Sequence, residues 1–454
     1  MDVRGIETSE RLDPHAELLD RCEKEIAQGM MPVQIFGNDA VFDAELQRIF
    51  ARTWNFMGHE SEIPNPGDFV VRRIGLDPVI VVRGQDNDIR VLSNYCRHRA
   101  TQLCQVDQGN ATHFQCPYHG WIYKLTGEWQ SAPKVNRAYR DLDPKEWGLF
   151  QANVETYRGL IYANLRHDAE PLQDFLGGTK WFLDLIFGMH PDGMRVVGPP
   201  TRWRMRSDWK SGPDNFVGDN YHVDTTHYSM DLVGAMPNSK QMVDYVYQYD
   251  VSDGFSFTGH NFRKWFGAEW DTPWGYPKDL ADQFDLSQFD EGQLSVLNDT
   301  GLVTGNMWPN LSFIRFPGTP DPTATPPATY TQLRQFLPVG PGEMEIWVWQ
   351  FAWNCESPEY TEAQIAAGTN AFSSAGLFEQ DDTIVWEGFS RAGRSVFPAQ
   401  TDDMALNFQL GMGTMSDNPI DEDWKGPGVA RMTGIGESGQ RNFYRRWLAE
   451  MRSA

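Results

Sequence analysis

Four potential metal ligands stand in two short pairs between residues 96 and 119, and no other feature constrains the fold of this chain as strongly. The first pair is Cys96-Arg-His98 and the second is Cys116-Pro-Tyr-His119. Each pair can bind a metal ion from one tight loop, because thiolate and imidazole are both metal ligands. The fold must therefore bring two loops to one point.

Two metal centres fit this ligand set. Two Cys and two His could form a tetrahedral zinc site. They could also hold a two-iron, two-sulfur cluster, with both Cys on one iron and both His on the other. Structural zinc sites usually pair Cys with Cys and His with His, whereas each loop here carries one of each. The spacing favours the iron–sulfur cluster over zinc.

The run Cys-Pro-Tyr-His-Gly-Trp at 116–121 strengthens a likeness to a known motif. The pattern Cys-x-His followed by Cys-x2-His resembles the Rieske motif. This resemblance implies that Cys96, His98, Cys116 and His119 hold a [2Fe–2S] cluster. The surrounding residues 55–165 contain short β-branched runs broken by Gly, Pro and Asp-Asn, which predicts a small antiparallel β domain with both loops at its tip.

Composition narrows the class of protein. The 454 residues suffice for two or three domains. We expect no membrane span, because no run of about 18 apolar residues exists, and no secretory signal, because the polar N-terminus lacks an apolar core. The five cysteines show no pairing pattern, which predicts a reducing, cytoplasmic location. The net charge of −23 argues against a nucleic-acid partner.

The remaining sequence predicts an α+β protein. It has an N-terminal antiparallel β Rieske domain and a C-terminal α+β catalytic domain, whose antiparallel sheet is flanked by helices. Strand-like runs alternate with Pro/Gly-rich connections between 241 and 355. Helices are expected within 15–30, 43–54, 178–240, 358–391 and 440–452. The expected divisions are 1–50 for N-terminal helices packing on the catalytic domain, 51–170 for the Rieske domain and 171–454 for the catalytic domain.

A second candidate metal site lies in residues 208–227 (DWKSGPDNFVGDNYHVDTTH). Asn215, Asp219 and His222 would share one face of a regular helix, at about 100° per residue. His222 and His227 would lie roughly 140° apart on that helix. Both can reach one metal only if the helix kinks or ends between them. The intervening Val-Asp-Thr-Thr is a poor helix former, which makes such a break plausible.

Two His and one carboxylate can hold a mononuclear iron with positions left open for O2. The stretch 376–388 (GLFEQDDTIVWEG) offers Glu379, Asp381, Asp382 and Glu387. Spacing alone does not choose among these four carboxylates. For Asp381 the simpler interpretation is a solvated charge or a helix cap.

The order of motifs extends the resemblance over nearly the whole chain. The Rieske motif is followed by Asn-Asp-His-His, then Trp-Pro-Asn-Leu-Ser at 308–312 and Phe-Glu-Gln-Asp-Asp at 378–382. This order resembles the α subunit of Rieske non-haem iron ring-hydroxylating dioxygenases, of the polycyclic aromatic hydrocarbon and phthalate kind. The resemblance implies that His222, His227 and Asp382 bind the iron, with Asn215 nearby. One departure is Asp214, where many relatives carry Glu before the Asn.

The resemblance also implies a function. The chain would be a terminal oxygenase that adds both atoms of O2 to an aromatic ring, giving a cis-dihydrodiol. Electrons would come from NADH through a reductase and a ferredoxin; no G-x-G-x-x-G follows a strand here, so we expect no NADH site in the chain itself. The expected substrate is a polycyclic aromatic hydrocarbon or a related aromatic compound. Alternatives are a Rieske monooxygenase, an oxygenase of aromatic acids such as phthalate or salicylate, and a Rieske electron carrier without oxygen chemistry.

An oligomer follows from the same resemblance. It implies a ring of three α subunits, with or without β subunits (α3β3 or α3). Asp219 would bridge its own His222 and His119 of the next chain, and carry the electron between subunits.

The substrate pocket is expected to have apolar and aromatic walls. The candidates are Phe216, Val223, Leu311, Phe313, Phe372 and Phe378, for which plain core packing is the alternative. Leu311, Phe313 and Arg315 share one face of a strand, because side chains alternate. Arg315 would pair with a substrate carboxylate if that face lined the pocket. Otherwise it is a surface charge at the strand end, which is the favoured interpretation.

Overall fold

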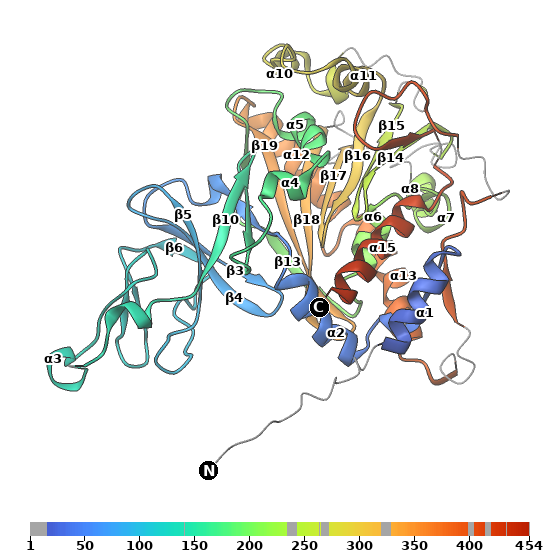
Figure 1. The fold of residues 1–454 in the computed structure, drawn as a ribbon. Coiled ribbons are helices and arrows are strands. Elements are labelled where there is room, and N and C mark those ends of the chain that lie inside the picture. Colours follow the sequence, from blue (N-terminus) through green and yellow to red (C-terminus); the bar gives the residue numbers. More distant parts are fainter. Residues whose placement is uncertain are drawn as a thin grey trace.

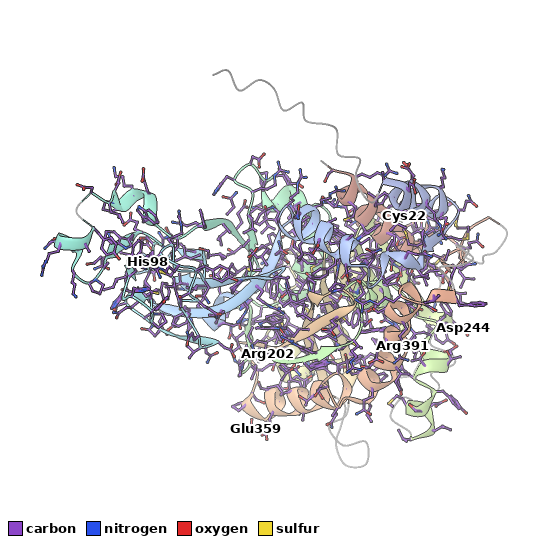
Figure 2. The ribbon with its side chains drawn as sticks, turned by 90° about the horizontal axis from the view of Figure 1, so that it is seen from below. Cys22, His98, Arg202, Asp244, Glu359 and Arg391 are labelled. Carbon is purple, nitrogen blue, oxygen red and sulfur yellow. The ribbon has the colours of Figure 1, made fainter. Side chains whose placement is uncertain are left out.

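The computed structural model describes residues 16–139, 141–233, 243–262, 264, 272–318, 328–397, 404–413, 419–432 and 434–453. A β-rich part projects from a larger α+β body (Figure 1). Seen from below, the molecule is elongated, with His98 in the projecting part and Asp244 at the far end of the body (Figure 2). The predicted fold class, an antiparallel β domain followed by an α+β domain, is confirmed.

The projecting part contains two antiparallel sheets. The larger has the strand order β2-β11-β10-β5-β4-β3-β6, and the smaller has the order β7-β8-β9. The strands are β2 (Asn55–His59), β3 (Asp68–Ile74), β4 (Asp77–Arg83), β5 (Ile89–Ser93), β6 (Gln108–Asn110), β7 (Phe114–Gln115), β8 (Ile122–Tyr123), β9 (Trp129–Ser131), β10 (Gln151–Tyr157) and β11 (Leu160–Asn164). This part has a hydrophobic core of its own, which includes Phe69, Ile80, Leu92 and Trp121. The loops at its tip therefore rest on a local core.

The body is built on one large antiparallel sheet. Its strand order is β12-β19-β18-β17-β16-β15-β14-β21, and β13 also pairs with β19. The strands are β12 (Met194–Val196), β13 (Thr201–Met205), β14 (Val246–Ser252), β15 (Phe255–His260), β16 (Gly301–Met307), β17 (Leu311–Gly318), β18 (Ala328–Gly340), β19 (Glu343–Trp353) and β21 (Val429–Arg431). Strands β16 to β19 alternate in direction and are almost fully buried.

Helices flank this sheet, and α6, α13 and α15 gather on one side of it (Figure 1). The main helices are α1 (Ala16–Ile26), α2 (Asp39–Glu45), α5 (Thr179–Phe187), α6 (Ser211–Phe216), α7 (Val223–Thr226), α8 (Tyr228–Leu232), α11 (Glu291–Asp299), α12 (Pro358–Ala371), α13 (Leu377–Gly393) and α15 (Ser438–Arg452). Within the described ranges, none of the helices has the length and apolar character needed to cross a membrane.

A buried ionic network fixes the segment that leads into α6. The Lys210 ammonium donates to Glu45 at 2.7 Å and lies 2.7 Å from the Asp208 carboxylate. The indoles of Trp209 and Trp447 also donate to Glu45. Glu45 comes from α2 and Trp447 from α15, so both ends of the chain hold this segment. Removing one partner of such a network leaves a buried charge uncompensated, which typically costs several kcal/mol.

One secondary-structure expectation is partly wrong. The stretch 178–240 is not mainly helical, because β12 and β13 lie inside it; residues 234–242 are outside the described part. β13 reads Thr-Arg-Trp-Arg-Met and is largely exposed on the outer side of β19. Because it contains two arginines, β13 lacks the apolar pattern that marks a buried strand. The helical structure expected at 358–391 is present as two helices, α12 and α13, separated by residues 372–376.

Candidate metal centres and the cavity beside them

The two Cys–His loops, residues 96–101 and 116–121, have matching backbones. In each loop the Cys N–H donates to the carbonyl five residues later, and the Cys carbonyl accepts the N–H four residues later. The two distances are 2.9 and 2.8 Å for Cys96, and 2.7 and 3.0 Å for Cys116. Ala100 and Gly120 turn the two loops with φ of 54° and 70°. The two loops therefore share one backbone turn around the Cys, although the His comes two residues after Cys96 and three after Cys116.

The four predicted cluster ligands converge between these loops. Cys96 and Cys116 are buried and form no disulfide. The rings of His98 and His119 lie with centroids 4.5 Å apart. Both Nδ1 atoms are buried, and neither has a hydrogen-bond partner in the described part of the chain. Unpartnered buried nitrogens are costly unless a ligand satisfies them. Two thiols and two such nitrogens fit a [2Fe–2S] cluster.

Aromatic side chains support this centre. The Trp121 indole stacks on His98 with centroids 5.0 Å apart and 4° between the planes. The Tyr123 hydroxyl accepts the Arg97 N–H at 3.0 Å and lies 3.3 Å from Cys96 Sγ. The oxygen accepts the hydrogen bond from Arg97, which leaves the Tyr123 O–H able to donate to the sulfur. Hydrogen bonds to cluster sulfurs are one of the factors that set the reduction potential.

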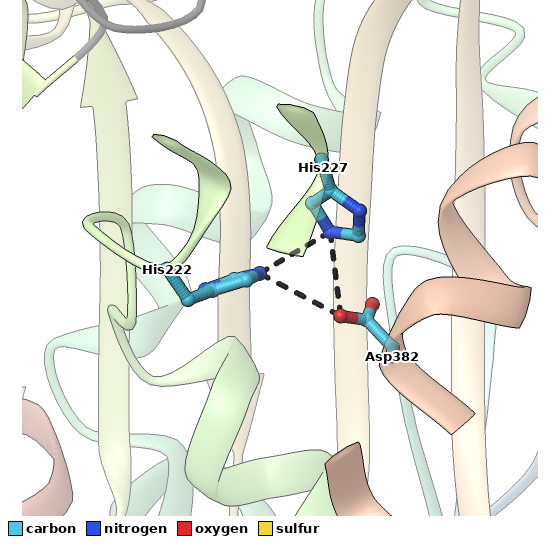
Figure 3. A group of neighbouring side chains, drawn as sticks. All are labelled: His222, His227 and Asp382. Carbon is cyan, nitrogen blue, oxygen red and sulfur yellow. Dashed lines mark hydrogen bonds and ion pairs between the residues drawn. The ribbon is translucent and has the colours of Figure 1, made fainter. Parts of the chain in front are cut away.

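A second metal-binding geometry lies in the body, where His222, His227 and Asp382 form a triangle, here called the His–His–Asp triad (Figure 3). The two Nε2 atoms are 3.3 Å apart, and Asp382 Oδ1 lies 3.6 Å from His222 Nε2 and 3.3 Å from His227 Nε2. Metal–ligand bonds of about 2.1 Å place neighbouring ligands roughly 3 Å apart. The triad therefore fits one metal ion bound on one face, with other positions open.

The local helix geometry differs in part from the prediction. His222 directly precedes α7 and His227 directly follows it, whereas α6 already ends at Phe216. A helix end does lie between the two histidines, as predicted, because α7 ends at Thr226; a further break, which was not predicted, separates α6 from His222. Gly218 lies in this break with φ of 136°, and a Cβ there would clash with the Gln248 amide. A single short turn between two histidines is enough to aim both at one point.

The structure separates the four candidate carboxylates of α13. Asp382 is 3% exposed and completes the triad. Glu379 forms a buried ion pair with Arg334 of β18, and Glu387 pairs with Arg391. Asp381 is neither a solvated charge nor a helix cap. Its Oδ2 lies 3.4 Å from His227 Nδ1 and accepts the Ser229 hydroxyl at 3.0 Å.

Each triad histidine thus has a carboxylate near its Nδ1, the ring nitrogen that does not point into the triad. Asp219 Oδ1 lies 3.5 Å from His222 Nδ1, and the Asp219 carbonyl also accepts from that nitrogen. Such partners fix the ring and its tautomer. Burial lowers the pKa of His222, but Asp219 and Asp382 outweigh burial and raise it to about 9. The triad is therefore built to hold positive charge. Asn215 Nδ2 lies 3.5 Å from His222 Nε2, beside the triad.

A cavity adjoins the triad, between the helices and the sheet. Besides the triad, its lining consists of Asn215, Phe216, Asp219, Asn220, Val223, His260, Val303, Thr304, Ile314, Phe316, Phe372 and Phe378. Of the six predicted wall residues, Phe216, Val223, Phe372 and Phe378 line it. Leu311 and Phe313 do not, because Ile314 and Phe316 are the β17 residues on the cavity side. Leu311 and Phe313 do lie on one face of β17, as predicted, but the opposite face is the one that lines the cavity.

Comparison with known proteins agrees with this geometry. The model of the Rieske [2Fe-2S] domain matches residues 53–157, and that of the ring hydroxylating alpha subunit (catalytic domain) matches residues 196–453. The chain belongs to the ring-hydroxylating oxygenase α subunits. It is thus a Rieske non-haem iron oxygenase, a family that uses a [2Fe–2S] cluster and an iron.

Individual relatives of this α subunit differ in their reactions. The N,N-dimethyl phenylurea N-demethylase subunit alpha of Sphingobium sp. (strain YBL2) is 41% identical, over 96% of this chain and 95% of its own length. The biphenyl 2,3-dioxygenase subunit alpha of Rhodococcus jostii (strain RHA1) is 30% identical, over 96% and 91%. Naphthalene 1,2-dioxygenase from Rhodococcus sp., bound to indole, superposes with a TM-score of 0.89 at 33% identity, covering 96% of this chain and 97% of that one.

Arg315 of the α subunit matches neither of its two interpretations. It is 2% exposed, so it is no surface charge, and it does not line the cavity. Its guanidinium donates to Thr331 Oγ1 at 2.9 Å and to the Ile186 carbonyl at 2.7 Å, and lies 4.2 Å from the Trp274 ring centroid. Arg315 therefore joins the sheet to α5.

Three polar lining residues, Asn220, His260 and Thr304, were missed by sequence reasoning. His260 and Thr304 lie in strands β15 and β16, which carry no motif, and Asn220 lies between motif residues as an ordinary polar residue. No signal in one sequence could have selected them, since only the fold brings them to the cavity.

Proposed function

We propose that this α subunit is the terminal oxygenase component of a multicomponent enzyme that oxidises an aromatic compound. In this proposal His222, His227 and Asp382 hold iron(II), which supplies O2 activation when bound. The observation that carries it is the convergence of three ligand atoms, all within 4.8 Å of one another, on the wall of a largely apolar cavity. A substrate in that cavity lies next to the triad and away from bulk water.

Electrons would enter through the cluster held by Cys96, His98, Cys116 and His119. Histidine ligation raises the potential above that of an all-Cys cluster, so a ferredoxin can reduce it. We infer that NADH is the source, through a separate reductase and ferredoxin in the cytoplasm.

The cluster of one subunit would serve the iron of its neighbour in a trimer, with or without β subunits. His98 lies in the part that projects away from the body, which favours contact with another subunit (Figure 2). Asp219 is 27% exposed at its side chain, and its Oδ1 lies 3.5 Å from His222 Nδ1. A carboxylate in that position can accept an N–H from His119 of the next chain as well as from His222. Exposed apolar residues such as Leu232 and Ile384 would be buried by such an assembly.

We propose oxidative N-demethylation of an N-methyl-N′-aryl compound as the first candidate reaction. It is supported by the 41% identity, over nearly the full length, with the N,N-dimethyl phenylurea N-demethylase subunit alpha. One oxygen atom enters a C–H bond of the N-methyl group and the other leaves as water, with two electrons from NADH and two protons. The N-hydroxymethyl product then breaks its C–N bond and releases formaldehyde.

Ring cis-dihydroxylation, the reaction predicted from the sequence, is the second candidate. It is supported by the biphenyl and naphthalene dioxygenases among the relatives. Phe372 and Phe378 stack at 5.1 Å beside the cavity and offer apolar surface to a flat ring. Aromatic acids are not proposed, since the described lining contains no Lys or Arg that could pair with a carboxylate.

The test uses the reconstituted holoenzyme with NADH, a ferredoxin and a reductase. N,N-Dimethyl-N′-phenylurea, naphthalene and biphenyl are supplied separately, and formaldehyde and cis-diols are measured. We expect formaldehyde in proportion to the NADH consumed with the urea. A cis-diol from the hydrocarbons and no formaldehyde would favour the second candidate. Absence of substrate-dependent O2 uptake with all three would contradict both.

A further inference from the structure

The walls of the cavity differ in polarity. Five of its residues come from neighbouring strands of the sheet: His260 of β15, Val303 and Thr304 of β16, and Ile314 and Phe316 of β17. Thr304 is the registered partner of both Thr258 and Ile314, so these side chains share one face. Asn220, from the loop before α7, meets this face through His260. The cavity thus has a polar group, Asn220, His260 and Thr304, that is separate from the metal ligands; we call it the polar subsite.

Hydrogen bonds fix the orientation of the Asn220 amide. Its Nδ2 donates to the Gly218 carbonyl at 3.1 Å, and its Oδ1 lies 3.2 Å from His260 Nε2. The Oδ1 must accept, so His260 Nε2 carries the proton. Burial lowers the pKa of His260 to about 3, so the ring is neutral and the subsite has no charge.

The polar subsite has hydrogen-bonding capacity left over. An Asn amide offers two N–H donors and two acceptor positions. In the described structure Asn220 uses one donor and one acceptor position, and it is 6% exposed. The Thr304 hydroxyl lies 2.7 Å from the Thr258 hydroxyl. When Thr258 donates in that pair, the Thr304 O–H is available to the cavity. In that orientation, the Thr304 O–H joins the unused Asn220 N–H as a second neutral donor at a largely apolar cavity.

This chemistry matches a neutral carbonyl group. A carbonyl oxygen accepts two hydrogen bonds, and an adjacent N–H could use the second acceptor position of Asn220. A hydrocarbon would leave these buried donors without hydrogen-bond partners, which costs free energy. A carboxylate would find no Lys or Arg in the described lining.

We propose that Asn220 and Thr304, with His260 as the residue that positions the Asn220 amide, bind the carbonyl of an N-aryl amide or urea. This contact decides which substrate carbon faces the His–His–Asp triad. The proposal rests on the proposed function, since it names the substrate class of the same cavity. Holding the carbonyl at the sheet leaves the N-methyl group, not the ring, free to meet the triad.

Binding is tested apart from turnover. Holoenzyme is titrated by calorimetry with N,N-dimethyl-N′-phenylurea and with (3-methylbutyl)benzene, a hydrocarbon of nearly the same shape. We expect tighter binding of the urea. Thr304→Val and Asn220→Leu should each weaken urea binding about 10-fold, as for a lost hydrogen bond, and change hydrocarbon binding less than about 2-fold. Thr304→Ser, which keeps the hydroxyl, should restore the urea preference.

The control is Ile314→Val, an apolar change on the same wall, which should weaken both ligands equally. Equal binding of the two ligands by the unaltered enzyme would overturn the subsite, whatever the enzyme turns over. So would a urea preference that survives in both Thr304→Val and Asn220→Leu. A urea that binds through these residues without yielding formaldehyde would instead contradict N-demethylation while upholding the subsite.

Discussion

The two candidate metal centres of this oxygenase are built in opposite ways. The cluster ligands all lie between residues 96 and 119, on two loops whose backbones match and which rest on a local core. The triad takes two ligands from the ends of a single helical turn and the third from α13, far along the chain. When the ligands of a centre lie close together in the sequence, they form a motif that can be recognised there. A centre assembled by the tertiary fold is visible in the sequence only in fragments.

The two centres also differ in their electrostatic surroundings. No Asp or Glu is buried in the described core beneath the Cys–His loops, whereas buried carboxylates surround the triad. Burial, His119 and Arg99 lower the pKa of His98, while carboxylates raise that of His222 to about 9. The carboxylates around the triad therefore favour a positive ion there, whereas the Cys–His loops have no such carboxylates around them among the residues that the structure describes.

The largest effect is expected from Cys116→Ser, which removes a thiolate from the local centre. We expect loss of the red-brown cluster absorbance and at least a ~100-fold fall in turnover, because electrons can no longer enter. The mononuclear iron should stay, since the body has a separate core. The matched control is Cys104→Ser, at a buried Cys between the loops, which should keep the cluster. A cluster retained in Cys116→Ser or lost in Cys104→Ser would refute the assignment.

Asp219→Asn probes the link between the two centres. The amide is nearly isosteric but cannot accept an N–H from two histidines equally well. Both metal centres should remain, and re-oxidation of the reduced cluster with substrate and O2 should slow roughly 10- to 100-fold, as when other ligand-orienting partners are lost. Stopped-flow absorbance measures this rate, and peroxide supplied directly should partly restore product. Normal cluster re-oxidation with normal product would exclude Asp219 as the bridge.

Acid should remove the mononuclear iron before it affects the cluster. With the pKa of His222 at about 9, a proton competes with the metal below that pH. Apparent iron affinity should fall about 10-fold per pH unit from pH 8 to 6, in line with one competing proton. Metal analysis after dialysis at each pH, with cluster absorbance recorded in parallel, measures this difference. Equal loss of both kinds of iron would show that the two sites do not differ in this way.

The smallest effect concerns Asp214, a buried carboxyl behind the triad that accepts the Tyr444 hydroxyl. Burial raises its pKa to about 8, from an ordinary value of 3.8. Between these values the folded chain keeps a proton that the unfolded chain has lost, so stability falls as pH rises. Asp214→Asn should raise the melting temperature by a few degrees at pH 9 and not at pH 4. A gain independent of pH would exclude ionisation as the cause.

The contrast between the centres explains what the sequence could predict. The Cys–His spacing, the antiparallel fold class and the order of motifs needed only local patterns. Asp382 could be separated from Asp381 only by resemblance, because adjacent residues on a helix differ by a rotation that tertiary packing sets. The same limit explains the wrong face of β17, where alternation groups Leu311 with Phe313 but does not say which side is covered.

Other gaps were of a different kind. β13 escaped notice because an exposed strand rich in arginine lacks an apolar signature. The polar subsite was invisible because its members come from β15, β16 and a loop, and meet only in the folded chain. Arg315 was misjudged because fully buried arginines are rare in proteins, and no pattern in the sequence indicated one.

Iron content in two neighbouring variants tests the triad most directly. The unaltered subunit should contain about three iron ions per chain, two in the cluster and one at the triad. Asp382→Ala should contain about two, with an unchanged Rieske EPR signal and no oxygenase activity. Asp381→Ala, which loses only the partner of His227 Nδ1, should keep the third iron when iron is in excess. Loss of the third iron from Asp381→Ala alone, with Asp382→Ala fully loaded and active, would contradict the triad.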